Sequence, residues 1–440
     1  MRNSFFFKQI DNSALIVFRM MFGLLLFLEA VGAIFTGWVR LAMIEPTFTF
    51  SFIGFEWLQP LPGLGMYFYY LLMGVFGFMV MIGYRYRLSM VMFTLMWTVV
   101  YLMQKSFYNN HYYFLILLCG IMIFLPANRA YSLDAKRKPE IRSESMPAWC
   151  KWIVVLQVWI VYTFASVAKL YPDWLDGTVA AEFMLRREDY PIIGAWLQQT
   201  WVHYVIIYFG ILYDLLVVPL LLYKRTRLWA FFLSIFFHIF NSIVFQIGIF
   251  PYLSLAFTLF FFEPKTIAGI FLKSKKVYSE NIQKIPQHAG IIKFLFISYL
   301  CVQLLLPLRH WAIPGDVLWT EEGHRMSWRM MLRTKKGFIK YKVVNKETGE
   351  INFINPVDSL TAKQMAALPN KPDFIWQYAQ RLKKQYQEKA LDVAVYAIGK
   401  VSVNNRSFTP LIDPEVDLAA EDWSAWCHHP WILPKPVDKE

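Results

Sequence analysis

Residues 14–35 read ALIVFRMMFGLLLFLEAVGAIF, and this stretch decides the fold class. It is apolar apart from Arg19 and Glu29, and it is long enough to cross a bilayer, which takes about 20 mostly apolar residues. It is also too long for the hydrophobic region of a signal peptide, so we interpret it as a retained first span. The stretch therefore predicts an integral membrane protein.

Further apolar stretches follow along most of the chain. Residues 228–262 form one apolar block that is too long for a single span, and Gly248 and Pro251 supply a break within it. The whole set predicts a polytopic α-helical membrane domain over residues 1–308, with about eight or nine transmembrane helices. The predicted spans are roughly 14–35, 64–83, 88–103, 112–127, 152–168, 203–223, 228–245, 247–262 and 291–308.

Residues 309–440 have the mixed composition of a soluble domain. The segments 338–344, 350–354 and 391–403 are strand-like, with a turn at 346–349 between the first two. Residues 359–368 and 372–388 read as helices. This part of the chain therefore predicts an α+β domain.

The loops between the predicted spans differ strongly in charge. On one side, the loops carry most of the lysines and arginines, and the other side has only Arg40, Lys105, Lys169, Arg186 and Arg187. Because lysine and arginine collect in cytoplasmic loops, the N-terminus is expected in the cytoplasm. An odd number of spans then places the C-terminal domain outside it, in a periplasm or an organelle lumen.

Composition argues against two other classes of protein. The net charge is +13, but no soluble basic domain is present to bind nucleic acid, and topology explains the excess of positive charge. The four cysteines form no C-x-x-C pair, so neither a disulfide framework nor a zinc site is expected.

Ionisable side chains within the spans are costly and are therefore functional candidates. Arg19 and Glu29 share the first span but are separated by roughly 15 Å of helix rise, so they cannot pair with each other. Asp214 and His238 lie in later spans. For these residues an ion pair or hydrogen bond that packs helices together is the alternative to a functional role.

Two further features lie at the predicted outer face. The loop 105–113 (KSFYNNHYY) packs amides, an imidazole and aromatic rings into a short turn. An interfacial belt would explain its tyrosines but not its asparagines or His111. Lys169 follows span five and is either a lysine reaching for the interface or a desolvated lysine that acts as a general base.

With these residues in place, the chain resembles the vitamin K-dependent gamma-glutamyl carboxylase family, with a membrane domain of HTTM type. Arg329 stands where the family pattern has an acidic residue, and the shorter C-terminus resembles that of a compact bacterial relative. The resemblance lies in ordered blocks: 11–23 (DNSALIVFRMMFG), 83–88 (GYRYRL), 105–111 (KSFYNNH), 161–177 (VYTFASVAKLYPDWLDG), 238–250 (HIFNSIVFQIGIF), 326–331 (MSWRMM), 348–356 (TGEINFINP) and 413–417 (DPEVD).

The resemblance implies a mechanism and its participants. Lys169 would deprotonate a reduced vitamin K, a hydroquinone of the phylloquinol or menaquinol type, which O2 then converts to the 2,3-epoxide. The strong base formed on the way would remove a γ-proton from glutamate in a peptide or protein, and the carbanion would capture CO2, without a metal. His111 and Asn110 would be catalytic with Lys169. The expected quinone-binding residues are Tyr108, Asn109, Trp174, His238 and Asn241.

The expected setting is a bacterial inner membrane, with a lipid bilayer and a quinone reductase as partners and no nucleic acid. Two alternatives of other classes remain. One is a quinone-binding membrane receptor or transporter on the same scaffold without carboxylation. The other is a haem b protein using His111, His203 and His238, which we disfavour because no two of these residues are expected at matching depths.

Overall fold

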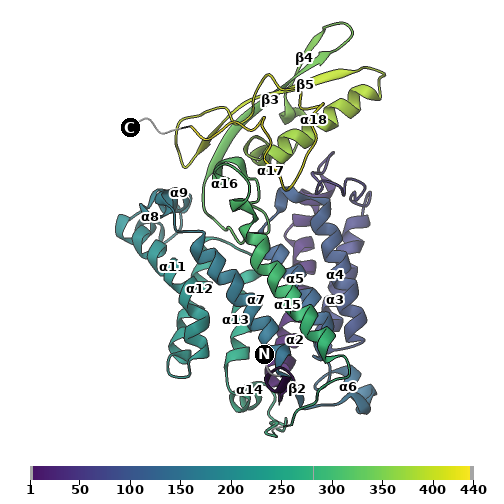
Figure 1. The fold of residues 1–440 in the computed structure, drawn as a ribbon, viewed down its shortest axis with the longest axis vertical. Helices are drawn as coiled ribbons and strands as arrows, with labels where there is room; N and C mark the ends of the chain where they lie inside the picture. Colours follow the sequence, from purple (N-terminus) through teal and green to yellow (C-terminus); the bar gives the residue numbers. More distant parts are fainter. Residues whose placement is uncertain (1–2, 281, 437–440) are drawn as a thin grey trace.

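The computed structural model describes residues 3–280 and 282–436. Long helices run side by side through the larger part of the molecule, and a smaller domain with a β-sheet covers one end of them, here termed the capped end (Figure 1). The long helices are α2 (Ser13–Phe35), α3 (Gly65–Ile82), α4 (Tyr86–Met103), α5 (Asn110–Phe124), α7 (Ala148–Val167), α11 (Thr200–Leu222), α12 (Arg227–Val244) and α15 (Ala289–Leu305).

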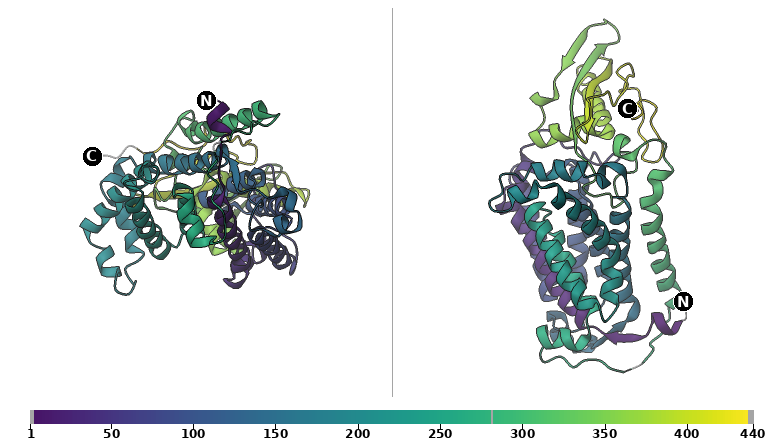
Figure 2. Two further views of the ribbon diagram at one scale, coloured as in Figure 1. Left: turned by 90° about the horizontal axis from the view of Figure 1, so that it is seen from below. Right: turned by 90° about the vertical axis from the view of Figure 1, so that its left-hand side faces the viewer.

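The predicted spans are confirmed as helices. Within the described residues, 7 helices are long and apolar enough to cross a membrane, and two shorter apolar helices cover the remaining spans. The short ones are α5 and the pair formed by α13 (Phe250–Phe257) and the 3-10 turn η4 (Thr258–Phe261). α15 stands at the edge of the bundle (Figure 2) and continues into η5 (Leu306–Trp311). The predicted break at Gly248 separates α12 from α13.

Glycine allows α2 and α3 to pack closely. A Cβ atom at Gly23 would lie 2.2 Å from the backbone nitrogen of Met81, and one at Gly77 would lie 2.7 Å from that of Phe27. Small residues at such positions let two membrane helices approach until their backbones touch.

The charged residues of α2 have structural partners. The buried Arg19 guanidinium donates hydrogen bonds to the carbonyls of Ala127, Ala130 and Tyr131, with N–O distances of 3.0, 3.4 and 2.6 Å. Glu29 shares a side-chain hydrogen bond with Tyr112, which belongs to the loop singled out above. The packing interpretation of Arg19 is therefore sufficient, since its guanidinium holds the loop at the uncapped end.

Short elements complete both ends of the bundle. At the capped end lie η2 (Lys105–Phe107), α8 (Pro172–Leu175), α9 (Thr178–Leu185) and α10 (Gly194–Leu197). The π-helical turn η1 (Arg40–Ile44) also lies at the capped end, where Gln104 donates to the carbonyl of Ala42. Elsewhere lie α1 (Asn3–Phe6), α6 (Leu133–Arg137), η3 (Pro139–Ile141), α14 (Pro264–Phe271) and the antiparallel pair β1 (Gln9–Asp11) and β2 (Ser145–Pro147).

The C-terminal domain is α+β, as predicted. Its antiparallel sheet has the order β4-β3-β5, with β3 at Lys335–Asn345, β4 at Ile351–Ile354 and β5 at Val393–Val403. The amphipathic helix α18 (Pro372–Gln387) packs on one face of the sheet and buries Phe374, Tyr378 and Leu382 there. Shorter elements are α16 (Val317–Thr320), η6 (Pro356–Asp358), α17 (Ala362–Ala367) and η7 (Leu368–Asn370). The proposed boundary between residues 308 and 309 stays a prediction.

Candidate functional site at the capped end of the bundle

The loop between α4 and α5 begins the site. Asn109 is extended and its side-chain oxygen accepts a hydrogen bond from the backbone nitrogen of Tyr112 at 2.7 Å, so it is the N-cap that starts α5. Asparagine favours this position because its side chain satisfies an amide that the first helical turn leaves unpaired. Asn109 therefore has a local structural task that accounts for its side-chain oxygen.

Tyr108 and Asn110 attach the loop to the C-terminal domain. The Tyr108 hydroxyl accepts from the backbone nitrogen of Met326 at 2.8 Å and donates to Asn110 Oδ1 at 2.9 Å. Asn110 Nδ2 in turn donates to the carbonyl of Arg329 at 3.0 Å. Both polar ends of the Asn110 amide are thus engaged, and the amide holds the MSWRMM segment against the membrane domain.

His111 and His238, which are far apart in the sequence, both contact the ring of Phe250. The His111 ring stacks on Phe250 with centroids 4.3 Å apart, and the His238 ring meets the same phenylalanine edge-on at 6.1 Å. The expectation that no two of the three histidines lie at matching depths is therefore wrong for this pair. Sequence spacing could not reveal it, because the contact depends on how the starts of α5 and α13 pack against α12.

His238 is the centre of a buried polar cluster. Its Nε2 lies 2.9 Å from the hydroxyl of Tyr162 and 3.1 Å from that of Tyr213. Its Nδ1 is buried and has no hydrogen-bond partner among the described residues. Asn241 follows one turn later on α12 and is half-buried. The sequence does not single out the two tyrosines, although Tyr213 directly precedes Asp214 and Tyr162 lies two helical turns before Lys169.

Lys169 turns inward and forms an ion pair with Asp214. Its side chain is 12% exposed and that of Asp214 is 6% exposed, so water reaches the pair poorly. On α7, Tyr162 and Ser166 precede Lys169 at helical spacing on one face, and Ser166 donates to the carbonyl of Ile211 on α11. Both charged residues are candidates from the sequence, but their spacing does not predict that they pair.

The Lys169–Asp214 pair is recessed below the capped end. Lys169 follows the end of α7, as predicted, but its partner Asp214 lies about fourteen residues after the start of α11, or about 21 Å along that helix. An interface-seeking lysine would point its ammonium outward. This ammonium instead points toward Asp214, which lies within electrostatic range of Tyr162 and Tyr213.

Trp174 borders Lys169 on α8. Its buried ring lies 5.9 Å from Lys169 Nζ, and its indole nitrogen has no hydrogen-bond partner in the described part of the chain. The neighbouring Asp173 accepts two hydrogen bonds from Arg406 and one from Asn404. These hydrogen bonds attach α8, the short helix that covers Lys169, to the C-terminal domain.

A cavity of about 770 Å³ lies between the loop and the C-terminal domain. Lys169, Trp174, His238 and Asn241 are outside the described residues that line it. Its membrane-domain wall consists of Trp38, 106–112 and 245–248, and its C-terminal-domain wall consists of Glu321, His324, Arg325, Arg329, Met330, Met331, Arg333, Lys363 and Lys371. The first wall is aromatic and amide-rich, and the second is rich in cations.

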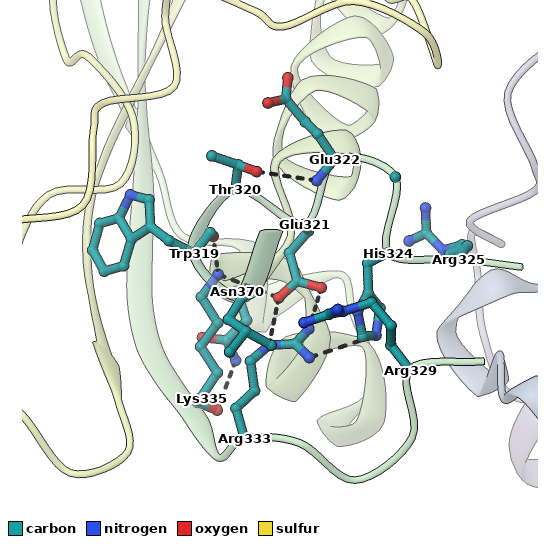
Figure 3. A network of polar contacts seen from close by, with 12 residues as sticks. Trp319, Thr320, Glu321, Glu322, His324, Arg325, Arg329, Arg333, Lys335 and Asn370 are labelled. Carbon is teal, nitrogen blue, oxygen red and sulfur yellow. Dashed lines mark hydrogen bonds and ion pairs between the residues drawn. The ribbon is translucent and has the colours of Figure 1, made fainter. Parts of the chain in front are cut away.

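Glu321 is the one acidic residue among the described residues that line the cavity, and its carboxylate is already paired with cations (Figure 3). It pairs with Arg333 and lies 3.4 Å from Lys335 Nζ. Burial raises the pKa of the Glu321 carboxyl, but Arg333 and Lys335 lower this pKa by more, so that it falls to about 2. His324 lies beside Arg333, and burial holds its pKa well below the usual value, so it is neutral at pH 7.

The remaining cations of this wall exceed the local negative charge. Burial lowers the pKa of Lys371 to about 8 and that of Arg329 to about 10. Arg329 Nε is buried and lacks a hydrogen-bond partner among the described residues, while its NH1 lies 3.3 Å from the imidazole of His310. Half-buried cations that outnumber the nearby carboxylates are poorly compensated, so this wall is suited to receive an anion.

A second acidic residue ties the wall to the loop. Asp373 lies 2.5 Å from Lys105 Nζ and accepts two further hydrogen bonds from Arg325, at 2.8 and 3.1 Å. Burial raises the pKa of Asp373, but Arg325 and Lys105 lower it by more, so it lies well below the usual range. This buried ion triad joins the two halves of the site.

Two family models match the chain over most of its length. The HTTM domain model matches residues 7–265, and the model described as vitamin K-dependent gamma-carboxylase, lumenal domain, matches residues 288–438. No solved structure matches the chain. Within residues 3–280 and 282–436, no three His, Cys, Asp or Glu side chains are grouped to hold a metal ion.

Proposed function

Because the chain belongs to the vitamin K-dependent gamma-carboxylase family, we propose that it couples oxidation of a reduced naphthoquinone to carboxylation of glutamate side chains. One observation carries the proposal: a single cavity has an aromatic and imidazole wall from the membrane domain and a cationic wall from the C-terminal domain. These two walls suit two different substrates, a flat apolar quinol and a carboxylate.

The membrane-domain wall fits a quinone. The cavity volume lies within the range of about 300–1,000 Å³ that small-molecule sites occupy. Trp38, Phe107 and Tyr112 offer ring faces, and His111 offers a polar nitrogen beside them. A narrow side pocket shares these aromatic residues and adds the hydroxyl of Tyr70, which is buried without a partner among the described residues. An unpaired donor of this kind suits a quinone oxygen.

The bound quinol supplies the chemistry: its oxidation by O2 to the 2,3-epoxide provides a base strong enough to remove a γ-proton from glutamate, which then takes up CO2. The protein's own contribution is to hold both substrates in a recessed site. Excluding water there protects a strong base from being quenched.

The cationic wall suits the glutamate side chain. Arg329, Lys363 and Lys371 line the cavity opposite the aromatic wall and outnumber the engaged Glu321. Arginine and lysine bind carboxylates through charge-assisted hydrogen bonds. They would hold the substrate carboxylate and, after reaction, the dicarboxylate product.

We assign Lys169 the role of the base that deprotonates the quinol. In the ion pair, the ammonium can pass its proton to Asp214, which replaces two poorly hydrated charges with a neutral amine and a neutral acid. The amine is then able to accept a proton from a quinol hydroxyl. Because Lys169 lies behind the cavity wall, we propose that the His238 cluster and His111 connect the lysine to the quinol.

The proposal includes a location and partners. The charge difference between the loops supports a cytoplasmic N-terminus and a C-terminal domain outside the cytoplasm, in a bacterial inner membrane or a related one. A lipid-soluble quinone would enter from the bilayer, and a quinone reductase would return it to the reduced state. The carboxylated partner would be a peptide or protein that contains glutamate.

The decisive experiment measures epoxide formed from quinol and O2 by the purified protein, with and without a glutamate peptide and labelled CO2. Lys169→Arg and Lys169→Ala should both be nearly inactive, since a guanidinium stays protonated and alanine has no base. A small amine should partly restore Lys169→Ala, at rates that follow its free-base fraction. Lys224→Arg, at an exposed lysine paired with Glu263, is the matched control and should keep full activity.

Three outcomes contradict parts of this proposal. An active Lys169→Arg would remove Lys169 from the role of base. Epoxide without labelled carboxylate would limit the protein to quinol oxidation. Quinone binding with no epoxide at all would instead indicate a receptor or transporter.

A further inference from the structure

The sheet of the C-terminal domain has one packed face and one open face. Along β3, Ile339, Tyr341 and Val343 are buried against the side of the sheet covered by α18, whereas Phe338 and Lys340 are exposed. An antiparallel sheet often leaves one face to water, so the alternation alone has no functional meaning. The composition of the open face is what requires an explanation.

The open face is basic and aromatic without any acidic residue. Phe338 is 58% exposed and Phe353 is 61% exposed, far more than phenylalanine needs to be on a sheet of this size. The strands β3, β4 and β5 contain no aspartate or glutamate. A face that is merely solvated mixes both signs of charge. We call this surface the lysine–aromatic face: Lys336, Phe338, Lys340 and Lys342 of β3, Phe353 of β4 and Lys400 of β5.

Rings and ammonium groups alternate across this face. Lys340 Nζ lies 4.9 Å from the ring centre of Phe353, and Lys342 Nζ lies 5.4 Å from that of Tyr396 on β5. The strand register places Phe338 opposite Lys400. Same-face residues on one strand are spaced by about 6.7 Å, which is also the spacing of alternate side chains in an extended peptide.

One edge beside this face is only partly covered, because Asn370 of η7 donates a hydrogen bond to the carbonyl of Lys335 there. β5 pairs with the whole of β3, but β4 pairs only with residues 341–344. Residues 335–340 therefore have no strand neighbour on the β4 side within the described chain. An extended segment can lie there without displacing an existing strand.

The position of the face favours a peptide over a lipid surface. The β3–β4 hairpin is the part of the molecule farthest from the helices (Figure 1), so its tip does not reach a bilayer. At the other end of β3, Lys336 lies 3.7 Å from Glu182 of α9, the helix that follows Trp174. The face thus leads from the tip of the domain toward the elements that cover Lys169.

We propose that the lysine–aromatic face binds an extended, glutamate-rich segment of the protein substrate and holds it while individual glutamates enter the cavity. Carboxylates of the segment would pair with the lysines. The methylene groups of its glutamate side chains and its apolar residues would cover Phe338 and Phe353. This inference rests on the proposed function for the identity of the partner. It adds a docking surface outside the cavity, with an acidic segment as its ligand.

The test measures binding to the full-length protein without quinol, so that it does not depend on turnover. A fluorescent synthetic glutamate-rich peptide is titrated into the wild type and into Lys340→Glu/Lys342→Glu. Reversing the exposed charge of Lys340 and the half-buried charge of Lys342 should raise Kd about tenfold, and added salt should weaken wild-type binding. The control Lys384→Glu/Lys389→Glu changes the net charge equally, at exposed positions at and beyond the end of α18, and should leave Kd unchanged.

The remaining outcomes separate this docking site from the catalytic proposal. Unchanged binding by Lys340→Glu/Lys342→Glu, equal weakening in the control, or equal binding of a glutamine-for-glutamate peptide would each overturn the docking site. A change in oligomeric state in that variant would identify the face as a contact between copies and also overturn it. The variant should still epoxidise quinol with a small glutamate derivative, and failure of epoxidation in the wild type as well would count against the proposed function alone.

Discussion

The buried triad of Lys105, Asp373 and Arg325 offers the sharpest test of how the two domains are joined. Lys105 and Asp373 are 1% and 4% exposed, so neither can turn to water if the other is removed. Asp373→Asn keeps the shape of the side chain but leaves Lys105 as a buried cation without its counter-ion. Removing one member of a buried ion pair costs about 3–5 kcal/mol.

The loss should appear first as local opening of the loop. Lys105 donates its backbone N–H to the carbonyl of Phe50 at 2.7 Å, and Tyr108 donates to the carbonyl of Lys105 at 3.0 Å. Hydrogen exchange of these two amides should accelerate by about two orders of magnitude or more in Asp373→Asn, since each 1.4 kcal/mol corresponds to a factor of ten.

Lys105→Met is the matched comparison. It removes the same contact from the other side, but Asp373 keeps both hydrogen bonds from Arg325. Lys105→Met should therefore lower the free energy of local opening by only about 1–3 kcal/mol. Hydrogen exchange of the two amides should accelerate less in this variant than in Asp373→Asn. Equal acceleration in the two variants, or none in Asp373→Asn, would refute the reasoning that an unpaired buried cation dominates.

The same triad predicts a pH dependence. Burial lowers the pKa of Lys105 from 10.5 to about 8, with Asp373 opposing the shift. Between pH 8 and 10.5, the folded protein then binds fewer protons at this site than the unfolded chain does. The free energy of unfolding therefore increases as the pH rises through this range. Thermal unfolding of the wild type in detergent should show this gain relative to Lys105→Met, and identical pH profiles would contradict it.

Three further predictions concern the catalytic side and the topology. His111→Ala and Asn110→Ala should each impair epoxide formation while the protein stays monodisperse in detergent; full turnover by both would reduce the loop to an interfacial belt. Asp214→Asn should abolish turnover while the protein stays folded, because the amide cannot take up the lysine proton. An active variant would rule out proton transfer within the pair. Cys427, which is exposed, should react with an impermeant thiol reagent from outside intact cells, whereas a cysteine introduced at Lys138 should not; the reverse pattern would invert the orientation.

The linear sequence determined the architecture because hydropathy acts locally. Each predicted span forms a helix, since a long apolar segment must satisfy its own backbone hydrogen bonds in a bilayer. The strands and helices of the C-terminal domain agree for a similar reason, as the period of alternation fixes which face of each element is buried. β5 ends in a turn at Asn404 and Asn405, whose φ angles are both positive, 51° and 64°.

Tertiary structure alone decided which chemical groups meet. Lys169 and Asp214 had each been singled out, yet their pairing depends on how far α11 extends past the end of α7, which no local pattern encodes. The meeting of His111 and His238 on Phe250 depends likewise on how α5, α12 and α13 pack together. The cationic wall faces the loop through long-range contacts such as that of Lys105 with Asp373, which are 268 positions apart, and these contacts form only when both domains are folded and docked.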